Sequence, residues 1–126
     1  MKKRSCKRFS IPGTTLYYKR KRSLFKKAQY PDIYYPVINI SKGGAQFLCN
    51  ERLKAGKQLE IKILIPGHPE PLEILSDVRW IAKNREQSYT YQTGIAFHPY
   101  GDLKHQNPTE ILDALVRLEE DAAEEI

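Results

Sequence analysis

An alternation of apolar and polar side chains over residues 58–65 restricts the possible folds of this chain more than any other feature. Large aliphatic residues occupy every second position, and Gln58, Glu60 and Lys62 stand between them. The aliphatic residues are Leu59, Ile61, Ile63 and Ile65. A period of two places each kind of side chain on its own face of an extended strand, whereas a helix requires a period of 3.6. The segment is therefore predicted to be a half-buried β-strand.

A second alternating segment follows directly and indicates a hairpin. Residues 66–69, Pro-Gly-His-Pro, are typical of a turn. Beyond this turn, one face of the next strand carries Leu72, Ile74, Val78 and Trp80. The other face carries Glu73, Asp77, Arg79 and Lys83. Two alternating strands joined by a short turn pair in the antiparallel sense, so we expect a hairpin with Trp80 on its apolar face.

Four further segments have the composition of strands. Residues 14–19, 33–40, 45–50 and 89–97 are rich in β-branched and aromatic residues, and polar or glycine-containing segments separate them. Pro36 interrupts the second of these strands and places it at a sheet edge or a bulge, because proline cannot donate to a β-ladder. Six strands in this arrangement predict an all-β, antiparallel barrel or sandwich. Closure is the usual way in which such sheets remove their edges.

The last part of the chain is predicted to be one helix, at about residues 107–124. Asn107 is a suitable N-cap, Pro108 fits the first helical position and Glu110 fits the capping box. Apolar residues then recur at helical spacing. They are Ile111, Leu112, Leu115, Leu118 and Ala122. This stripe is expected to pack against the barrel.

The positive charge of the chain is concentrated near its N-terminus. Residues 1–30 contain eleven Lys and Arg and no acidic residue, while the other 96 residues contain ten basic residues and all 15 acidic ones. A basic segment of this kind favours an anionic partner. We therefore expect a flexible basic arm at residues 1–13 and one barrel domain at residues 14–126. A domain of this size needs no disulfide or metal to be stable.

The sequence offers little for catalysis, metal binding or membrane insertion. Its two cysteines, Cys6 and Cys49, lack the spacing of a disulfide framework or a zinc site. The three histidines have no acidic or cysteine neighbour at ligand spacing, and no phosphate loop or nucleophile elbow is present. No apolar run reaches the roughly 18 residues that a membrane span requires. These observations predict a cytoplasmic binding protein that is not an enzyme and has no cofactor.

Two short motifs occur together in this sequence. The first is Arg4-x-x-x-Arg8, just before the first predicted strand, and the second is Asn39-x-Ser41-x-x-Gly44, in the turn after the second strand. A Gly-Ile-Ala-Phe strand lies downstream, at residues 94–97. With these motifs, nearly the whole chain resembles the PilZ family of cyclic di-GMP receptors. The resemblance implies a six-stranded antiparallel β-barrel with a C-terminal helix, in agreement with the strand pattern.

The resemblance also implies which residues bind the ligand. An arginine fork can contact the O6 and N7 acceptors of guanine, or a phosphate, with two hydrogen bonds, so Arg4 and Arg8 are expected to clamp cyclic di-GMP. Asn39 stands where the family has Asp or Asn and is expected to accept from the guanine edge. Ser41 offers a hydroxyl group, and Gly44 lets the backbone turn and approach the ligand.

Four further residues are weaker candidates for the same site. Trp80 ends the long strand of the predicted hairpin, where some PilZ domains have an aromatic residue beside the ligand. Lys3 stands directly before the first motif arginine, where the family often has another arginine that bears on whether one or two ligands bind. Lys7 borders Arg8, and Gly43 belongs to the second motif.

The resemblance implies a receptor that orders its N-terminal arm on binding cyclic di-GMP and signals to a protein partner. Motility, exopolysaccharide or virulence control are the processes that the family suggests. One alternative is a small basic barrel that binds RNA or DNA. In that case Arg4, Arg8 and the basic residues 19–27 would contact phosphates, and Tyr17, Tyr18 or Trp80 would stack on bases. Another alternative is a degenerate PilZ fold that binds only protein.

Overall fold

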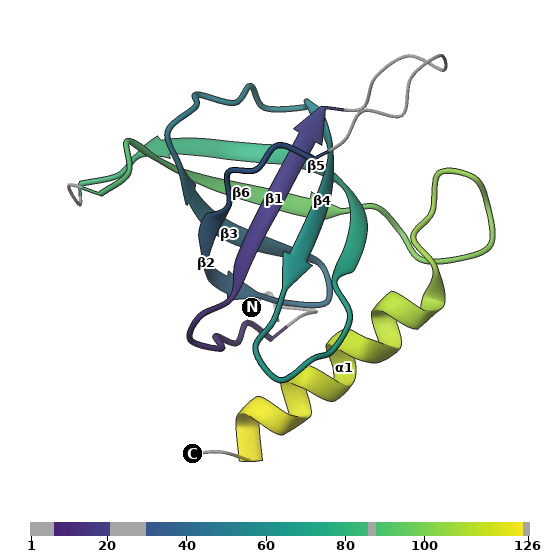
Figure 1. The fold of residues 1–126 in the computed structure, drawn as a ribbon. Helices are drawn as coiled ribbons and strands as arrows, with labels where there is room; N and C mark the ends of the chain where they lie inside the picture. Colours follow the sequence, from purple (N-terminus) through teal and green to yellow (C-terminus); the bar gives the residue numbers. More distant parts are fainter. Residues whose placement is uncertain (1–6, 21–29, 86–87, 125–126) are drawn as a thin grey trace, which may run out of the picture.

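Six antiparallel strands form a closed barrel in this protein. The structure, a computed structural model, describes residues 7–20, 30–85 and 88–124. The elements of these residues are β1 (Thr15–Arg20), β2 (Tyr35–Ile40), β3 (Gly44–Cys49), β4 (Gln58–Leu64), β5 (Leu72–Lys83), β6 (Tyr91–Phe97) and α1 (Thr109–Glu124). The strands follow one another around the barrel in the order β1, β2, β3, β6, β5, β4 (Figure 1). The predicted all-β barrel with a C-terminal helix is therefore confirmed.

The interior of the barrel is filled by the residues that the alternation predicts. The four alternating aliphatic residues Leu59, Ile61, Ile63 and Ile65 are buried, with at most 4% of their surface exposed, whereas Leu64 points outward and is 38% exposed. Leu16 of β1 and Ile74 of β5 lie beside them on the neighbouring strands, opposite Ile63 and Ile61, and these two residues and Phe47 of β3 are equally buried. Because every strand contributes apolar side chains to the interior, a single core fills the barrel.

The strand β2 begins two residues later than the sequence predicts. Ile33 and Tyr34 lie outside it and are 62% and 56% exposed. From Tyr35 the strand pairs with β1 over two residue pairs, one of which joins Pro36 to Thr15. The register with β3 then shifts between residues 37 and 39. A bulge thus follows the proline, and it sets which residues of β2 lie opposite β3.

The predicted position of Trp80 on the core face is wrong. The register between β5 and β6 shifts between Val78 and Trp80, so Arg79 is an extra residue in β5. One extra residue moves every later side chain to the opposite face of the sheet. Trp80 is consequently 38% exposed, and Ile81 packs against the core in its place.

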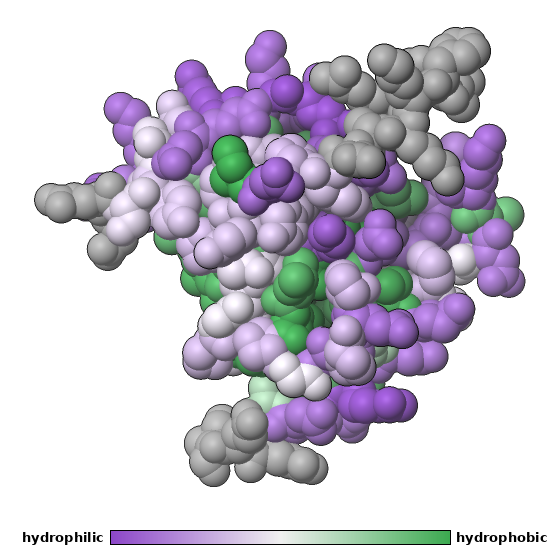
Figure 2. Space-filling view, in the orientation of Figure 1, coloured by the Kyte–Doolittle hydropathy of each residue, from purple (hydrophilic) through white to green (hydrophobic). Residues whose placement is uncertain are grey.

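The helix α1 packs against the barrel through the predicted stripe. Leu115 is fully buried, and Ile111 and Leu118 contact the core. Figure 1 shows the helix lying along one end of the barrel, beside the turn between β4 and β5. In the same orientation, Figure 2 shows mainly hydrophilic side chains, with an apolar patch near the end of β4 and above the helix.

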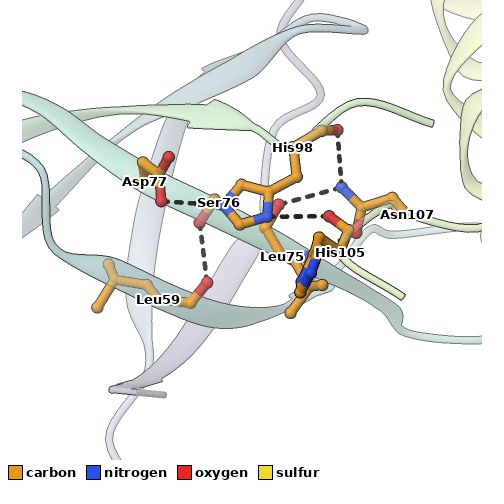
Figure 3. Close-up of polar contacts among 7 residues, drawn as sticks. All are labelled: Leu59, Leu75, Ser76, Asp77, His98, His105 and Asn107. Carbon is orange, nitrogen blue, oxygen red and sulfur yellow. Dashed lines mark hydrogen bonds and ion pairs between the residues drawn. The ribbon is translucent and has the colours of Figure 1, made fainter. Parts of the chain in front are cut away.

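Asn107 has a different role from the predicted N-cap. Its side chain is buried, and its Oδ1 accepts a hydrogen bond of 2.7 Å from the Leu75 amide. Its Nδ2 donates to the carbonyl oxygens of Leu75 and His98, each at 3.0 Å (Figure 3). Asn107 therefore ties the segment before α1 to β5 and to the end of β6, and the helix begins later, at Thr109.

The stability of the fold should decrease as the pH rises above 10, in part because of Tyr18. Its hydroxyl donates a 2.7 Å hydrogen bond to Glu51, and burial, this bond and the Glu51 charge raise the pKa of Tyr18 above its ordinary value of 10.0. The unfolded chain therefore loses this proton at a lower pH than the folded chain. Above that pH, the free energy of unfolding should fall by up to about 1.4 kcal/mol per pH unit.

Urea unfolding between about pH 9 and pH 11 tests this expectation. Tyr18→Phe removes the ionisable hydroxyl, so the variant should show a shallower loss of stability with pH than the wild type. Equal slopes in the two proteins would contradict a contribution from Tyr18.

Candidate functional site

A cavity of about 240 Å³ lies where the predicted motifs meet. It is formed on the outer face of β3, β5 and β6, next to the segment that precedes β1. The residues that line it include Arg8, Ser41, Gly43, Gly44, Gln46, Arg79, Trp80 and Gly94. The structure thus brings together residues from both sequence motifs and from the long β5 strand.

The backbone before β1 holds Arg8 beside Asn39. Phe9 and Ile40 exchange two backbone hydrogen bonds of 2.8 and 2.9 Å, and Ser10 Oγ donates to the Ile38 carbonyl at 2.7 Å. Arg8 Nη1 then donates to Asn39 Oδ1 at 3.2 Å. Two predicted site residues that are 31 positions apart are therefore in direct contact.

Part of the predicted arm lies outside the described residues. Lys3 and Arg4 are among these, so their predicted roles stay predictions. Lys7 is exposed next to Arg8. Within the segment 1–13, Phe9 and Ser10 are bonded to β2 as described above, and residues 11–13 form the turn into β1.

Ser41 shapes the turn of the second motif. Its amide donates to the Gly44 carbonyl at 2.8 Å, and its hydroxyl accepts a hydrogen bond of 3.1 Å from the Gly43 amide. Two contacts from outside the turn hold it in place. The Phe97 amide donates to the Gly43 carbonyl at 2.8 Å, and the Tyr100 hydroxyl donates to the Lys42 carbonyl at 2.6 Å. The turn is therefore anchored to β6 and to the loop after it.

Two residues at the bulge in β5, Arg79 and Trp80, line the cavity. Trp80 lies directly over Gly94 of β6, because a Cβ atom at residue 94 would be 2.3 Å from the indole Nε1. Arg79, the extra residue of the bulge, adds a second guanidinium to the lining. Arg79 was not predicted to be a site residue. Gly94 was the available signal in the sequence, because a glycine inside a strand often marks the close approach of another group.

The sequence matches the family model of the PilZ domain over residues 2–113. The chain belongs to the PilZ domain family. No curated protein matches it significantly. Solved structures with a similar fold include three proteins that share 16–18% sequence identity with this PilZ domain.

These three structures match almost the whole of this PilZ domain. The Bacillus subtilis inhibitor of motility MotI/DgrA has a TM-score of 0.67 and 16% identity, and the match covers 96% of this chain and 53% of that one. Escherichia coli YcgR in complex with c-di-GMP has a TM-score of 0.64 and 18% identity, with 97% and 48% covered. MrkH, described as a c-di-GMP-dependent transcription regulatory factor, has a TM-score of 0.59 and 16% identity, with 95% and 52% covered. This PilZ domain thus spans about half the length of these proteins and shares their fold.

Gly44 has a structural role that the motif alone did not indicate. It is the first residue of β3 in this PilZ domain and pairs with Ala96 of β6. A Cβ atom at residue 44 would lie 2.2 Å from the Ile95 carbonyl oxygen. The absence of a side chain therefore permits the close approach of β3 and β6.

Gly44→Ala should consequently lower the free energy of unfolding by about 1–3 kcal/mol, the usual cost of forcing extra atoms into a packed region. Urea unfolding measures this loss directly. An unchanged unfolding midpoint would mean that the strands separate without cost and that the glycine is not needed for packing.

Other features of the PilZ domain are less suited to a functional site. A cavity of about 380 Å³ near the end of β4 is lined mainly by prolines and aliphatic residues, with Gly13, Thr15 and His68, and by none of the motif residues. His98 Nε2 lies 2.9 Å from Asp77 Oδ1, a pair that the sequence did not predict (Figure 3).

Within the described ranges, no group of three or more His, Cys, Asp or Glu is placed to hold a metal ion. The described part of the chain also contains no helix long and apolar enough to cross a bilayer.

Proposed function

We propose that this PilZ domain is a receptor for cyclic di-GMP and that it binds the ligand at the cavity between Arg8 and residues 39–44. One observation carries the proposal. Arg8 lines this cavity together with Ser41 and Gly43, and its guanidinium is hydrogen-bonded to Asn39. E. coli YcgR, whose structure contains c-di-GMP, has the same fold.

The chemistry of the lining suits a dianionic dinucleotide. Arg8 is exposed, and its hydrogen-bond partner among the described residues, Asn39, is a neutral amide that does not compensate its charge. A guanidinium can bind a phosphate or the guanine edge with two hydrogen bonds, each strengthened by the charge. Arg79 adds a second positive charge, and the partly exposed ring of Trp80 offers a surface for base stacking. Asn39 and Ser41 supply neutral polar groups.

The cavity accommodates part of the ligand, and the arm is proposed to cover the rest. Its volume of about 240 Å³ is below the roughly 300–1,000 Å³ of typical small-molecule sites. Arg4 belongs to the same motif as Arg8 and is proposed as the second clamp on the ligand. Ordering of the arm would change the surface that the protein offers to a partner protein, and this change is the proposed signal.

The nucleic-acid alternative has less support. Of the aromatic residues expected to stack on bases, Tyr18 is only 9% exposed and is packed between Tyr35 and Phe47. The Tyr17 ring already contacts Lys62 and Tyr34. Trp80 is available, but it lies over the cavity that the motif residues line.

Isothermal titration of cyclic di-GMP into the wild-type protein tests the proposal. We expect saturable binding that weakens only modestly with salt, because a ligand with two phosphates releases few counterions. A single-stranded oligonucleotide is the matched competitor. The opposite outcome is a protein that does not bind cyclic di-GMP and binds the oligonucleotide with an affinity that falls steeply with salt. That result would contradict the proposed function and support the nucleic-acid alternative.

A further inference from the structure

A row of amide side chains crosses the outer face of β2, β3 and β6 beside the cavity. The bulge in β2 places Asn39 directly opposite Gln46 of β3. Asn39 Nδ2 donates to Gln46 Oε1 at 3.4 Å, and Gln92 Nε2 of β6 donates to the same oxygen at 3.5 Å. At the other end of the row, Asn39 Oδ1 accepts from Arg8. Four side chains thus form one hydrogen-bonded row that ends at Arg8.

Arg8 fixes the direction of every bond in this row. A guanidinium can only donate hydrogen bonds, so the oxygen of the Asn39 amide must face it. The Asn39 nitrogen then faces Gln46 and requires an acceptor, which is the Gln46 oxygen. That oxygen also accepts from Gln92, so both of its neighbours in the row are donors. The Gln46 amide is therefore held with its Nε2 group away from both partners.

Gln46 also lines the cavity, and its nitrogen has no acceptor among the described residues. We propose that Gln46 is a specificity-determining residue that donates a hydrogen bond from Nε2 to the guanine base of the ligand. This inference rests on the proposed function, since it concerns the same cavity. A glutamine whose amide oxygen and nitrogen are both free recognises adenine: the oxygen accepts from N6 and the nitrogen donates to N7. With its oxygen occupied by two donors, Gln46 offers only N–H groups, which suit the O6 and N7 acceptors of guanine and oppose the N6 donor of adenine.

Two substitutions of Gln46 test whether its Nε2 group donates to the ligand and whether it favours guanine over adenine. Gln46→Leu removes the donor, and we expect affinity for cyclic di-GMP to fall about three- to tenfold, the value of one neutral hydrogen bond. The preference for cyclic di-GMP over cyclic di-AMP should fall by a similar factor. Gln46→Glu keeps the size but offers only acceptors, so it should weaken cyclic di-GMP binding more strongly and reduce the preference further. Gln58→Glu, at an exposed glutamine of β4, is the matched control and should change neither quantity.

Titrations of both cyclic dinucleotides into the wild type and these variants test the inference, with circular dichroism melting as the check on folding. Gln46 lies on the outer face of β3 and is only half-buried, so both variants should melt like the wild type. If the wild type binds cyclic di-GMP and both Gln46 variants keep its affinity and its preference over cyclic di-AMP, the role of Gln46 is refuted and the proposed function stands. If the wild type binds neither dinucleotide, the proposed function itself fails.

Discussion

Arg8→Ala should weaken cyclic di-GMP binding about a hundredfold or more, with little change in stability. Charge-assisted hydrogen bonds contribute about 1.5–3 kcal/mol each, and a guanidinium that contacts the ligand with two of them supplies the largest share of the affinity of any described residue. Arg8 is exposed, and its hydrogen bond to Asn39 is exposed too, so water can replace that bond and the fold depends on it little. Calorimetry measures the affinity, and urea unfolding measures the stability.

Two variants serve as controls for Arg8. Arg8→Lys keeps the charge and loses the planar fork, so its affinity should lie between those of the wild type and Arg8→Ala. Lys7→Ala removes a neighbouring exposed charge and should cost far less. Arg4→Ala is expected to resemble Arg8→Ala. Equal affinities for Arg8→Ala and Lys7→Ala would mean that the arm acts through its charge alone, and the proposed clamp would then be wrong.

Asn107→Ala should lower the free energy of unfolding by about 2–4 kcal/mol, the largest stability effect that we expect of a polar side chain in this fold. Its removal leaves the part-buried Leu75 amide and His98 carbonyl without their Asn107 partners. The Leu75 carbonyl is less affected because it also accepts from the His98 amide at 2.9 Å. Urea unfolding gives the size of the loss.

Asn50→Ala is the matched control for Asn107. The Asn50 side chain also accepts from a backbone amide, that of Thr90, but it is exposed, so water can replace the lost bond. Its loss of stability should stay below about 1 kcal/mol. Similar losses at Asn50 and Asn107 would show that Asn107 does not tie the segment before α1 to the barrel.

The barrel was predictable because its strands follow simple periodicities. In β4, every second residue is aliphatic, and burial of one face is enough to fix both the strand and its orientation. The amphipathic stripe of α1 was predictable for the same reason. Local patterns of this kind are set by the chain itself and do not depend on which distant segment lies opposite.

The features that required the structure depend on distant partners. The bulge at Arg79 changes which face carries Trp80, and nothing in the local sequence distinguishes the regular strand from the bulged one. Asn107 has the local context of an N-cap, but β5 offers its side chain better partners. The motif residues identified the site region, whereas Gln46 and Arg79 reach it only because β3 and β5 lie beside β6.

Amide hydrogen exchange with and without cyclic di-GMP tests most directly whether the ligand binds between the arm and the turn of the second motif. We predict added protection at residues 4–8 and at residues 41–46 when the ligand is bound, because both segments would contact it. Protection of β4 should stay unchanged, since its backbone bonds belong to the barrel in either state. Ligand binding that adds protection at neither segment, or residues 4–8 that are already protected in the free protein, would contradict the proposed site and the ordering of the arm.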